Sequence, residues 1–369
     1  MDLVLLVVAL GVILLGAELF TNGIEWFGHR LNLAEGAVGS VLAGIATALP
    51  ETLIPVIAIL GPVLAGQSAP QSSEIGVGAI LGAPFMLATL AMFVTGAAIL
   101  VFSRRGRRSI EVSASPRVLA RDLAFFVAAY AAVVATAFLP EPLRPVRWFV
   151  AIGLLITYAF YVRAHFGDDA ESSDAGSLNR LHATRLQRRT EAPEVELLRH
   201  GHSAADHEAP PRLRIIVGQV VVALGLIILG AQIFVGAVED LASVAGLDPR
   251  ILALIIAPVA TELPEQMNSV LWVRSGKDTL AMGNITGAMV FQSCLPTILG
   301  IVFTDWAFNA QTAIGFASAG AAFVSIALIF GLMLRRGRLS AWSLLIGGPI
   351  YLVYVAAALL LPVGTAGPH

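Results

Sequence analysis

The sequence predicts an all-α integral membrane protein, with ten transmembrane helices arranged as two inverted five-helix repeats. Three observations support this fold class. Hydrophobic residues make up 57% of the 369 residues and charged residues only 13%, a composition outside the range of soluble domains. Ten apolar runs are long enough to cross a bilayer. A short polar phrase occurs twice, once in each half of the chain.

The apolar runs predict where the helices lie. A helix needs about 20 apolar residues to cross roughly 30 Å of hydrocarbon. Runs of this length cover residues 3–27, 36–60, 74–102, 117–139, 146–165, 213–238, 247–272, 278–303, 310–334 and 340–362. The first run begins with Asp2 instead of a basic cluster, so we expect a retained helix and not a signal peptide.

A polar stretch with scattered histidines separates the fifth run from the sixth. The irregular spacing of these histidines favours a solvated linker over a metal-sensing site. We therefore divide the chain into a first membrane repeat at 1–165, a cytoplasmic linker at 166–211 and a second, inverted membrane repeat at 212–369.

The duplicated phrase reads Ala46-Thr47-Ala48-Leu49-Pro50-Glu51 in the first half and Ala260-Thr261-Glu262-Leu263-Pro264-Glu265 in the second. The phrases Gly16-Ala17-Glu18-Leu19-Phe20 and Gly230-Ala231-Gln232-Ile233-Phe234 match at the same spacing. Residues 78–83 match residues 283–288 after a short insertion. Such self-similarity indicates an internal duplication.

The basic residues predict the orientation in the membrane. Only Arg144, Arg147 and Arg250 lie at span ends on one face, and the rest of the 23 basic residues lie on the other. Because cytoplasmic loops carry most basic residues, both termini are expected outside the cytoplasm. Each half has an odd number of spans, so the halves enter the membrane from opposite sides, as in many secondary transporters.

The duplicated phrase has the chemistry of an ion site. A proline inside a helix removes one backbone hydrogen bond and displaces the carbonyl four residues earlier, which becomes available as an oxygen ligand. Thr47 and Thr261 lie four residues before Glu51 and Glu265, so hydroxyl and carboxylate share one helix face. Oxygen ligands alone are the set that Ca²⁺ prefers, and Na⁺ takes the same kind.

Three glutamates at membrane depth need a compensating charge. A carboxylate at mid-helix costs roughly 2.5–3.5 kcal/mol, so Glu51, Glu262 and Glu265 together cost on the order of 8–10 kcal/mol if left unpaired. No lysine or arginine lies near them within the predicted spans. A bound cation or protonation is therefore expected, with protonated packing groups as the alternative.

Glu262 lies three residues before Glu265, close to the same helix face. Two carboxylates this close disfavour each other's ionisation, which suits proton coupling. We interpret Glu262 as a proton carrier or substitute ligand, with a residue facing a vestibule as the alternative.

At these residues the sequence resembles the Ca²⁺/cation antiporter superfamily, the sodium/calcium exchangers and their prokaryotic relatives. Members carry two inverted repeats, each with a Gly-Thr-Ser-x-Pro-Glu phrase followed by a Gly-Asn-x-x-Gly-Ser-Asn phrase. Here the second phrase is retained only in the second half of the chain, as Gly283-Asn284-Ile285-Thr286-Gly287, and residues 78–82 are a diverged copy of it. The resemblance covers both membrane halves and implies an integral protein of a prokaryotic inner membrane.

The resemblance implies roles for individual residues. The family's two Ca²⁺-binding glutamates match Glu51 and Glu265, and its Na⁺-binding threonines match Thr47 and Thr261. Its backbone carbonyl ligands, one turn before each threonine, match Gly44 and Pro258.

The chain also departs from the family pattern. Pro84 and Met289 stand where the family has a polar residue after Gly-Ser, and Ala48 and Glu262 replace the serine beside each threonine. Several Na⁺ ligands of the family are therefore missing, and Na⁺ and H⁺ both remain open as coupling ions.

Other polar residues are secondary candidates. Glu18 and Gln232 are expected to line gating helices or to make interhelical hydrogen bonds. Asn268, Gln292 and Ser293 could replace missing ligands or bond between helices, and Asn284 is expected mainly to pack the facing helix, with ligation as the alternative.

We predict a secondary antiporter that exchanges Ca²⁺ or a related cation for Na⁺ or H⁺ by alternating access. The alternatives are a cation channel or uniporter of the same fold, and a non-transporting membrane scaffold or sensor. The chain shows no nucleophile-base arrangement and no nucleotide-binding loop, so we do not expect an enzyme. The expected partners are inorganic cations and the lipid bilayer, without nucleic acid or nucleotide, and no cofactor beyond the transported cations Ca²⁺, Na⁺ or H⁺ is expected.

Overall fold

The computed structural model describes residues 2–64, 66, 70–167, 181–183, 211–244, 262–309 and 312–360, and these are almost entirely helical. The longest helices are α1 (Asp2–Arg30), α6 (Pro116–Thr136), α7 (Val146–Phe166), α9 (Leu213–Val244), α13 (Asp278–Phe303) and α14 (Ala313–Arg336). Another long helix consists of α4 (Pro70–Met86), the π-helical turn η2 (Leu87–Ala91) and α5 (Met92–Arg104).

The remaining elements are short. They are η1 (Ala37–Ala43), α2 (Gly44–Thr47), α3 (Leu49–Leu64), η3 (Glu141–Leu143), α12 (Leu263–Arg274), α15 (Ala341–Leu344) and α16 (Gly347–Leu360). The strands β1 (Glu111–Val112) and β2 (Leu339–Ser340) form one antiparallel pair between the two halves of the chain.

Eight helices in the described part of the chain are long and apolar enough to cross a membrane. They coincide with eight of the ten runs found in the sequence. The predicted span 36–60 is divided instead into η1, α2 and α3, with a break at Ala48. Of the predicted span 247–272, α12 covers the second part, and residues 247–261 lie outside the described residues.

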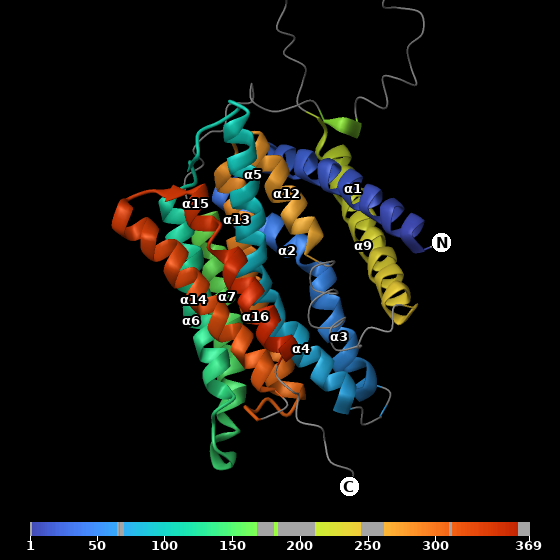
Figure 1. Cartoon of the computed structure of the whole chain (residues 1–369), viewed down its shortest axis with the longest axis vertical. Coiled ribbons are helices and arrows are strands. Elements are labelled where there is room, and N and C mark those ends of the chain that lie inside the picture. Colours follow the sequence, from blue (N-terminus) through green and yellow to red (C-terminus); the bar gives the residue numbers. More distant parts are fainter. Residues whose placement is uncertain are drawn as a thin grey trace, which may run out of the picture.

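Helices α1 and α9 lie side by side at one edge of the bundle (Figure 1). A β-carbon at Gly16 would lie 2.9 Å from Ile227, and one at Gly230 would lie 2.8 Å from Ile13. Gly16 and Gly230 are the matching glycines of the duplicated Gly-Ala phrases. Each copy therefore uses the same glycine to bring its helix against the other, because small residues let helices approach closely in membranes.

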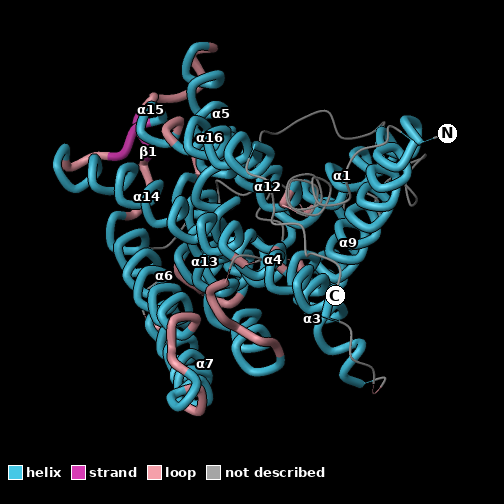
Figure 2. The backbone as a smooth tube through the Cα atoms, turned by 60° about the horizontal axis from the view of Figure 1, so that its bottom comes forward, coloured by secondary structure: helices cyan, strands magenta, loops and turns pink. Residues whose placement is uncertain are grey.

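Helix α13 runs through the interior and is surrounded by other helices (Figure 2). It packs against η1, α2, α4, α6, α7 and α12. The contact with η1 is made at glycine: a β-carbon at Gly287 would lie 1.9 Å from the Ser40 carbonyl oxygen. Backbone thus touches backbone where the first-half segment meets α13.

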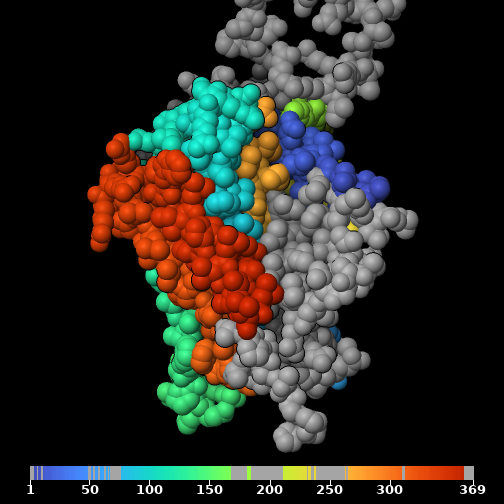
Figure 3. All heavy atoms as spheres, viewed as in Figure 1, coloured from blue at the N-terminus to red at the C-terminus, as the bar shows by residue number. Residues whose placement is uncertain are grey.

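The outer helices expose large apolar side chains. Phe149 on α7 is 75% exposed, Val324 on α14 is 53% exposed and Leu352 on α16 is 65% exposed. Helices α14, α15 and α16 cover much of the face shown in Figure 3. Such surfaces suit contact with lipid, where apolar side chains lose nothing by remaining outside the protein core.

A short piece of the predicted linker lies against this bundle. Leu181 is buried, and the backbone N–H groups of His182 and Ala183 donate to Asn22 on α1 and Gln219 on α9. The rest of the linker prediction falls outside the described residues.

Candidate cation site

The residue before Leu-Pro-Glu has the same backbone conformation in both copies of the duplicated phrase. Ala48, between α2 and α3, has φ −81° and ψ 2°, and Glu262, directly before α12, has φ −83° and ψ −3°. Both residues precede a Leu-Pro-Glu sequence that begins a new helix. Each proline is therefore the second residue of a helix, where its missing N–H has no helical partner to lose. The prediction that these prolines lie inside continuous helices was therefore wrong, because α3 begins at Leu49 and α12 begins at Leu263.

Three carboxyl groups are buried at these breaks. Glu51 is 6% exposed, and Glu262 and Glu265 are each 1% exposed. Within the described part of the chain, none of their carboxyl oxygens has a hydrogen-bond partner. The Glu265 carboxyl interacts electrostatically with those of Glu51 and Glu262, so the three groups share one buried region. The structure thus brings together residues from both halves of the chain.

The helix termini offset only part of the cost of this burial. Glu51 and Glu265 lie in the first turns of α3 and α12, where the positive end of the helix dipole favours an anion. That effect is worth about 0.3–1 kcal/mol, against roughly 2.5–3.5 kcal/mol for a carboxylate at membrane depth. A positive charge, either a cation or protons, must supply the remainder.

Asn284 on α13 connects the two copies. The Thr47 hydroxyl lies 3.1 Å from Asn284 Oδ1 and 3.0 Å from the Ala43 carbonyl oxygen, and it can donate to one of them at a time. Asn284 Nδ2 donates to the backbone carbonyl of Glu265 (3.2 Å) and to Ser269 Oγ (3.4 Å). Asn284 therefore forms a hydrogen-bonded bridge between the two copies, and its expected roles in packing and in ligation stay predictions.

Asn268 adds an amide to the second-half side of the site. It is completely buried, and neither its side-chain oxygen nor its nitrogen has a hydrogen-bond partner among the described residues. Glu262, Glu265 and Asn268 follow one another at intervals of three residues, so they lie near one face of the chain at this helix start. Buried polar groups are normally hydrogen-bonded. This concentration of unpaired oxygens is suited to a cation or to ordered water.

The other predicted ligands have different surroundings. A β-carbon at Gly44 would lie 2.8 Å from the Ala288 nitrogen, so this glycine allows α2 to contact α13. Gln292 is buried on α13, and the Ser293 hydroxyl donates to the Met289 carbonyl of its own helix (2.6 Å). Thr261 and Pro258 lie outside the described residues.

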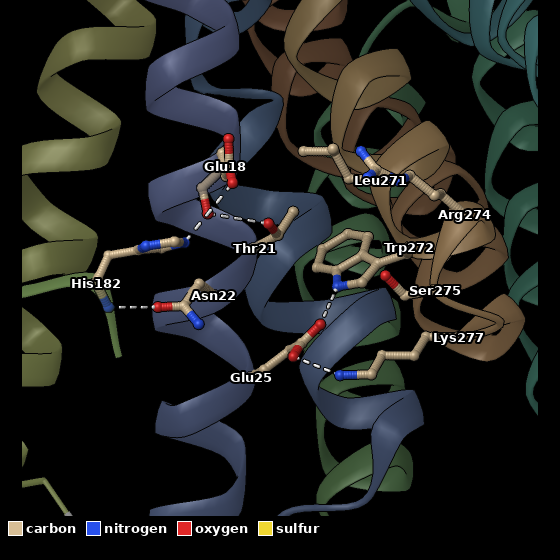
Figure 4. A pocket seen from close by; sticks show the side chains of 10 residues that line it. All are labelled: Glu18, Thr21, Asn22, Glu25, His182, Leu271, Trp272, Arg274, Ser275 and Lys277. Atoms are coloured by element: carbon tan, nitrogen blue, oxygen red, sulfur yellow. Dashed lines mark hydrogen bonds and ion pairs between the residues drawn. The ribbon is translucent and has the colours of Figure 1, made fainter. Parts of the chain in front are cut away.

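Glu18 and Gln232 do not join the three carboxylates. The Glu18 side chain is 62% exposed, and its Oε1 lies 3.8 Å from His182 Nε2. It lines a separate polar pocket of about 200 Å³, where Glu25 accepts hydrogen bonds from Trp272 Nε1 (2.8 Å) and Lys277 Nζ (2.5 Å) (Figure 4). Gln232 is exposed on α9.

A second buried polar cluster, centred on a single carboxyl group, was not predicted from the sequence. Asp122 on α6 is completely buried and accepts hydrogen bonds from Ser40 on η1 and Thr286 on α13. The signal was present, because Asp122 is an acidic residue inside the apolar run 117–139 and carries the same burial cost as the glutamates. Ser40 and Thr286 gave no such signal, since hydroxyls are common in membrane helices.

Comparison with known proteins gives a consistent result. A family model described as sodium/calcium exchanger protein matches residues 1–167 and 215–360. The chain is 32% identical over 82 residues to a putative antiporter, CaxA, of Alkalimonas amylolytica. That match covers 22% of this chain and 25% of the relative, so it spans only about a quarter of that protein.

The fold is similar to that of the sodium-calcium exchanger NCX_Mj. A structure of that protein soaked with Na⁺ and Sr²⁺ superposes with a TM-score of 0.65 at 16% identity, covering 98% of each chain. A structure soaked with Na⁺ and Ca²⁺ gives a TM-score of 0.65 at 15% identity, covering 96% of this chain and 98% of the other. At this identity the likeness concerns the fold.

Proposed function

This chain belongs to the sodium/calcium exchanger family, and from this we propose that it is a secondary active antiporter that exchanges Ca²⁺ or a related cation for Na⁺ or H⁺. The family is one of transporters rather than enzymes, with a membrane setting and inorganic cations as cargo. The proposed mechanism is alternating access at a site between the two Leu-Pro-Glu helix starts.

One observation carries the proposal. Glu51, Glu262 and Glu265 are buried together without hydrogen-bond partners among the described residues, beside the bridge between Thr47 and Asn284. A structural role would be expected to pair such groups. A transported cation instead needs oxygens that are free to bind it and then to release it.

The proposed architecture is ten membrane spans in two inverted repeats, 1–165 and 212–369, joined by a cytoplasmic linker. Both termini would lie outside the cytoplasm, in a prokaryotic inner membrane. Two observations support the repeat: the matching backbone at Ala48 and Glu262, and the reciprocal contacts of Gly16 and Gly230.

We assign Glu51 and Glu265 as the main cation ligands and Thr47, Thr261 and the carbonyls of Gly44 and Pro258 as further ligands. Pro84 and Met289 are buried and offer no side-chain oxygen. Glu262 stands where the first copy has Ala48, and its carboxyl interacts electrostatically with Glu51. Glu262 is therefore proposed as a substitute ligand or proton carrier at this site.

Transport into reconstituted vesicles tests the proposal. Uptake of ⁴⁵Ca²⁺ is measured with an outward Na⁺ gradient, an outward H⁺ gradient or neither, in wild type, Glu51→Gln and Glu265→Gln. We expect one gradient to drive uptake in the wild type and neither variant to respond. Uptake without any counter-ion gradient would favour a channel or uniporter. Absence of uptake under both gradients would overturn Ca²⁺ as the cargo and require other cations to be screened.

A further inference from the structure

Asp122 lies at the centre of a second polar cluster, formed by four helical segments. Its Oδ2 accepts hydrogen bonds from Ser40 Oγ on η1 (2.8 Å) and Thr286 Oγ1 on α13 (2.5 Å). Its Oδ1 accepts a hydrogen bond from the Tyr161 hydroxyl on α7 (3.1 Å) and lies 3.0 Å from His165 Nε2. One carboxyl group on α6 thus joins η1, α7 and α13.

The two hydroxyls that share Oδ2 belong to the two segments that build the candidate cation site. Ser40 lies two helical turns before Thr47, in the segment formed by η1 and α2. Thr286 lies two residues after Asn284 on α13. Thr47 and Asn284 are themselves in contact. The first-half segment and α13 are therefore held together at two points, by Asp122 at one and by Thr47 and Asn284 at the other.

The backbone between these points leaves little freedom. The Ser40 carbonyl oxygen would lie 1.9 Å from any β-carbon at position 287. It also lies 3.2 Å from the Tyr161 hydroxyl, which can donate to it or to Asp122 but not to both at once. Ser40 and Thr47 lie on consecutive helical segments, η1 and α2, so we expect a change in spacing at Ser40 to alter the position of Thr47.

The Asp122 carboxyl also contacts α7 through its second oxygen. The only titratable partners that its contacts show in the described part of the chain are Tyr161 and His165, both on α7. His165 Nδ1 lies 3.1 Å from the Tyr161 carbonyl oxygen, and its Nε2 lies 3.0 Å from Asp122 Oδ1. Asp122 is thus contacted at both of its side-chain oxygens, whereas an amide offers only one acceptor oxygen.

We propose that Asp122 is a positioning residue for the cation site: by accepting hydrogen bonds from Ser40 and Thr286 at one oxygen, it sets the spacing between the segment that carries Thr47 and the helix that carries Asn284. This inference rests on the proposed function, because the affected quantity is cation affinity. Asp122 is not proposed as a ligand of the cation.

The test compares the Ca²⁺ concentration for half-maximal uptake with the maximal rate. Asp122→Asn keeps the shape of the side chain and one acceptor oxygen, and Thr286→Val removes one donor while leaving Asp122 in place. Both variants are expected to raise the half-maximal Ca²⁺ concentration about tenfold. A change of this size lies within the range of coupling energies for residues that modulate a site without contacting its ligand. The maximal rate should change less than twofold. The double variant should be no weaker than the weaker single variant, because both remove the same interaction.

Thr136→Val is the matched control. Thr136 is a buried threonine on α6, and among the described residues its hydroxyl donates only to the Val133 carbonyl of its own helix (2.6 Å). It should leave the half-maximal concentration unchanged. An equal loss in Thr136→Val and Thr286→Val would overturn the proposal, because any buried hydroxyl would then matter. Unchanged affinity in both Asp122→Asn and Thr286→Val would also overturn it. If Asp122→Asn does not fold, Ser40→Ala with Thr286→Val decides the question.

Failure of the proposed function gives a different result. If the wild type takes up no Ca²⁺ under either gradient, the proposed cargo is wrong, and affinity is measured instead as the rise in melting temperature with Ca²⁺, Sr²⁺ or Na⁺. The positioning role then predicts a weaker response in Asp122→Asn for whichever of these cations stabilises the wild type. If Glu51→Gln abolishes uptake while Asp122→Asn and Thr286→Val keep wild-type affinity, only the positioning role is overturned.

Discussion

The Thr47 hydroxyl lies 3.1 Å from the side-chain oxygen of Asn284, whose amide donates to the backbone carbonyl of Glu265. One asparagine thus contacts the threonine of the first phrase and the glutamate of the second. The two helix starts that carry the buried carboxylates are therefore registered against each other through α13. Changes at this asparagine should reach both halves of the site.

Replacing either main glutamate by glutamine should weaken cation binding without lowering the stability of the fold. The cation must offset roughly 2.5–3.5 kcal/mol for each buried carboxylate, so Glu51→Gln or Glu265→Gln should weaken cation affinity about 100-fold or more. Without cation, the melting temperature should stay the same or rise, because a neutral amide is less costly to bury. Melting curves with and without Ca²⁺ measure both effects.

The control for these variants is Glu141→Gln. Glu141 is 76% exposed and pairs with Arg144 at the surface, where an ion pair contributes about 0–1 kcal/mol. The Glu141→Gln variant should show the same rise in melting temperature with Ca²⁺ as the wild type. A Ca²⁺ response that survives in both Glu51→Gln and Glu265→Gln would rule out these residues as ligands.

Removing the side chain of Asn284 should affect both stability and affinity. Asn284→Ala leaves Thr47, Ser269 and the Glu265 carbonyl without their shared partner, at a cost of about 1–3 kcal/mol in the free energy of unfolding. Cation affinity should fall as well, because the register between the copies is lost. Asn309→Ala is the control for loss of an asparagine, because the Asn309 side chain is exposed and accepts a hydrogen bond from the Thr312 N–H. Thermal unfolding and uptake kinetics together measure the result, and wild-type affinity in Asn284→Ala would argue against the bridge.

A methyl group at Gly287 should disrupt the interior. The added carbon would lie 1.9 Å from the Ser40 carbonyl oxygen, so Gly287→Ala should destabilise the protein by about 3 kcal/mol or more by overpacking. Gly153→Ala on α7 is the matched change, since a β-carbon there has no atom within 4 Å. It should be neutral or stabilising by up to about 1 kcal/mol. Equal melting temperatures for the two variants would contradict the close contact of η1 with α13.

Glu262 should determine how exchange depends on pH. If it carries the coupled proton, Glu262→Gln removes uptake driven by the H⁺ gradient and flattens the pH profile of exchange. Glu262→Ala places in the second copy the residue that the first copy has at Ala48, and should act in the same way. Uptake measured from about pH 5.5 to 8.5 provides the comparison. A pH profile unchanged in both variants would exclude Glu262 as the proton carrier.

Much of the fold follows from local sequence patterns. Hydropathy and run length correspond to eight apolar helices of the structure, because a membrane helix satisfies its own backbone and needs only apolar length. The break of the second run at Ala48 was less predictable. The sequence placed a proline inside a helix, whereas a new helix begins at Leu49 with Pro50 as its second residue.

The sequence by itself determined the membrane class, the positions of most helices and the duplicated phrase with Glu51 and Glu265. These follow from composition, length and the burial cost of a carboxylate, which are properties of a segment alone. Only the tertiary structure decided that Asn284 joins Thr47 to Glu265, that Glu18 lies apart from the site, and that Asp122 holds Ser40 and Thr286. Those pairings depend on where glycines let helices approach and which faces then meet, and packing between segments far apart in the chain sets both.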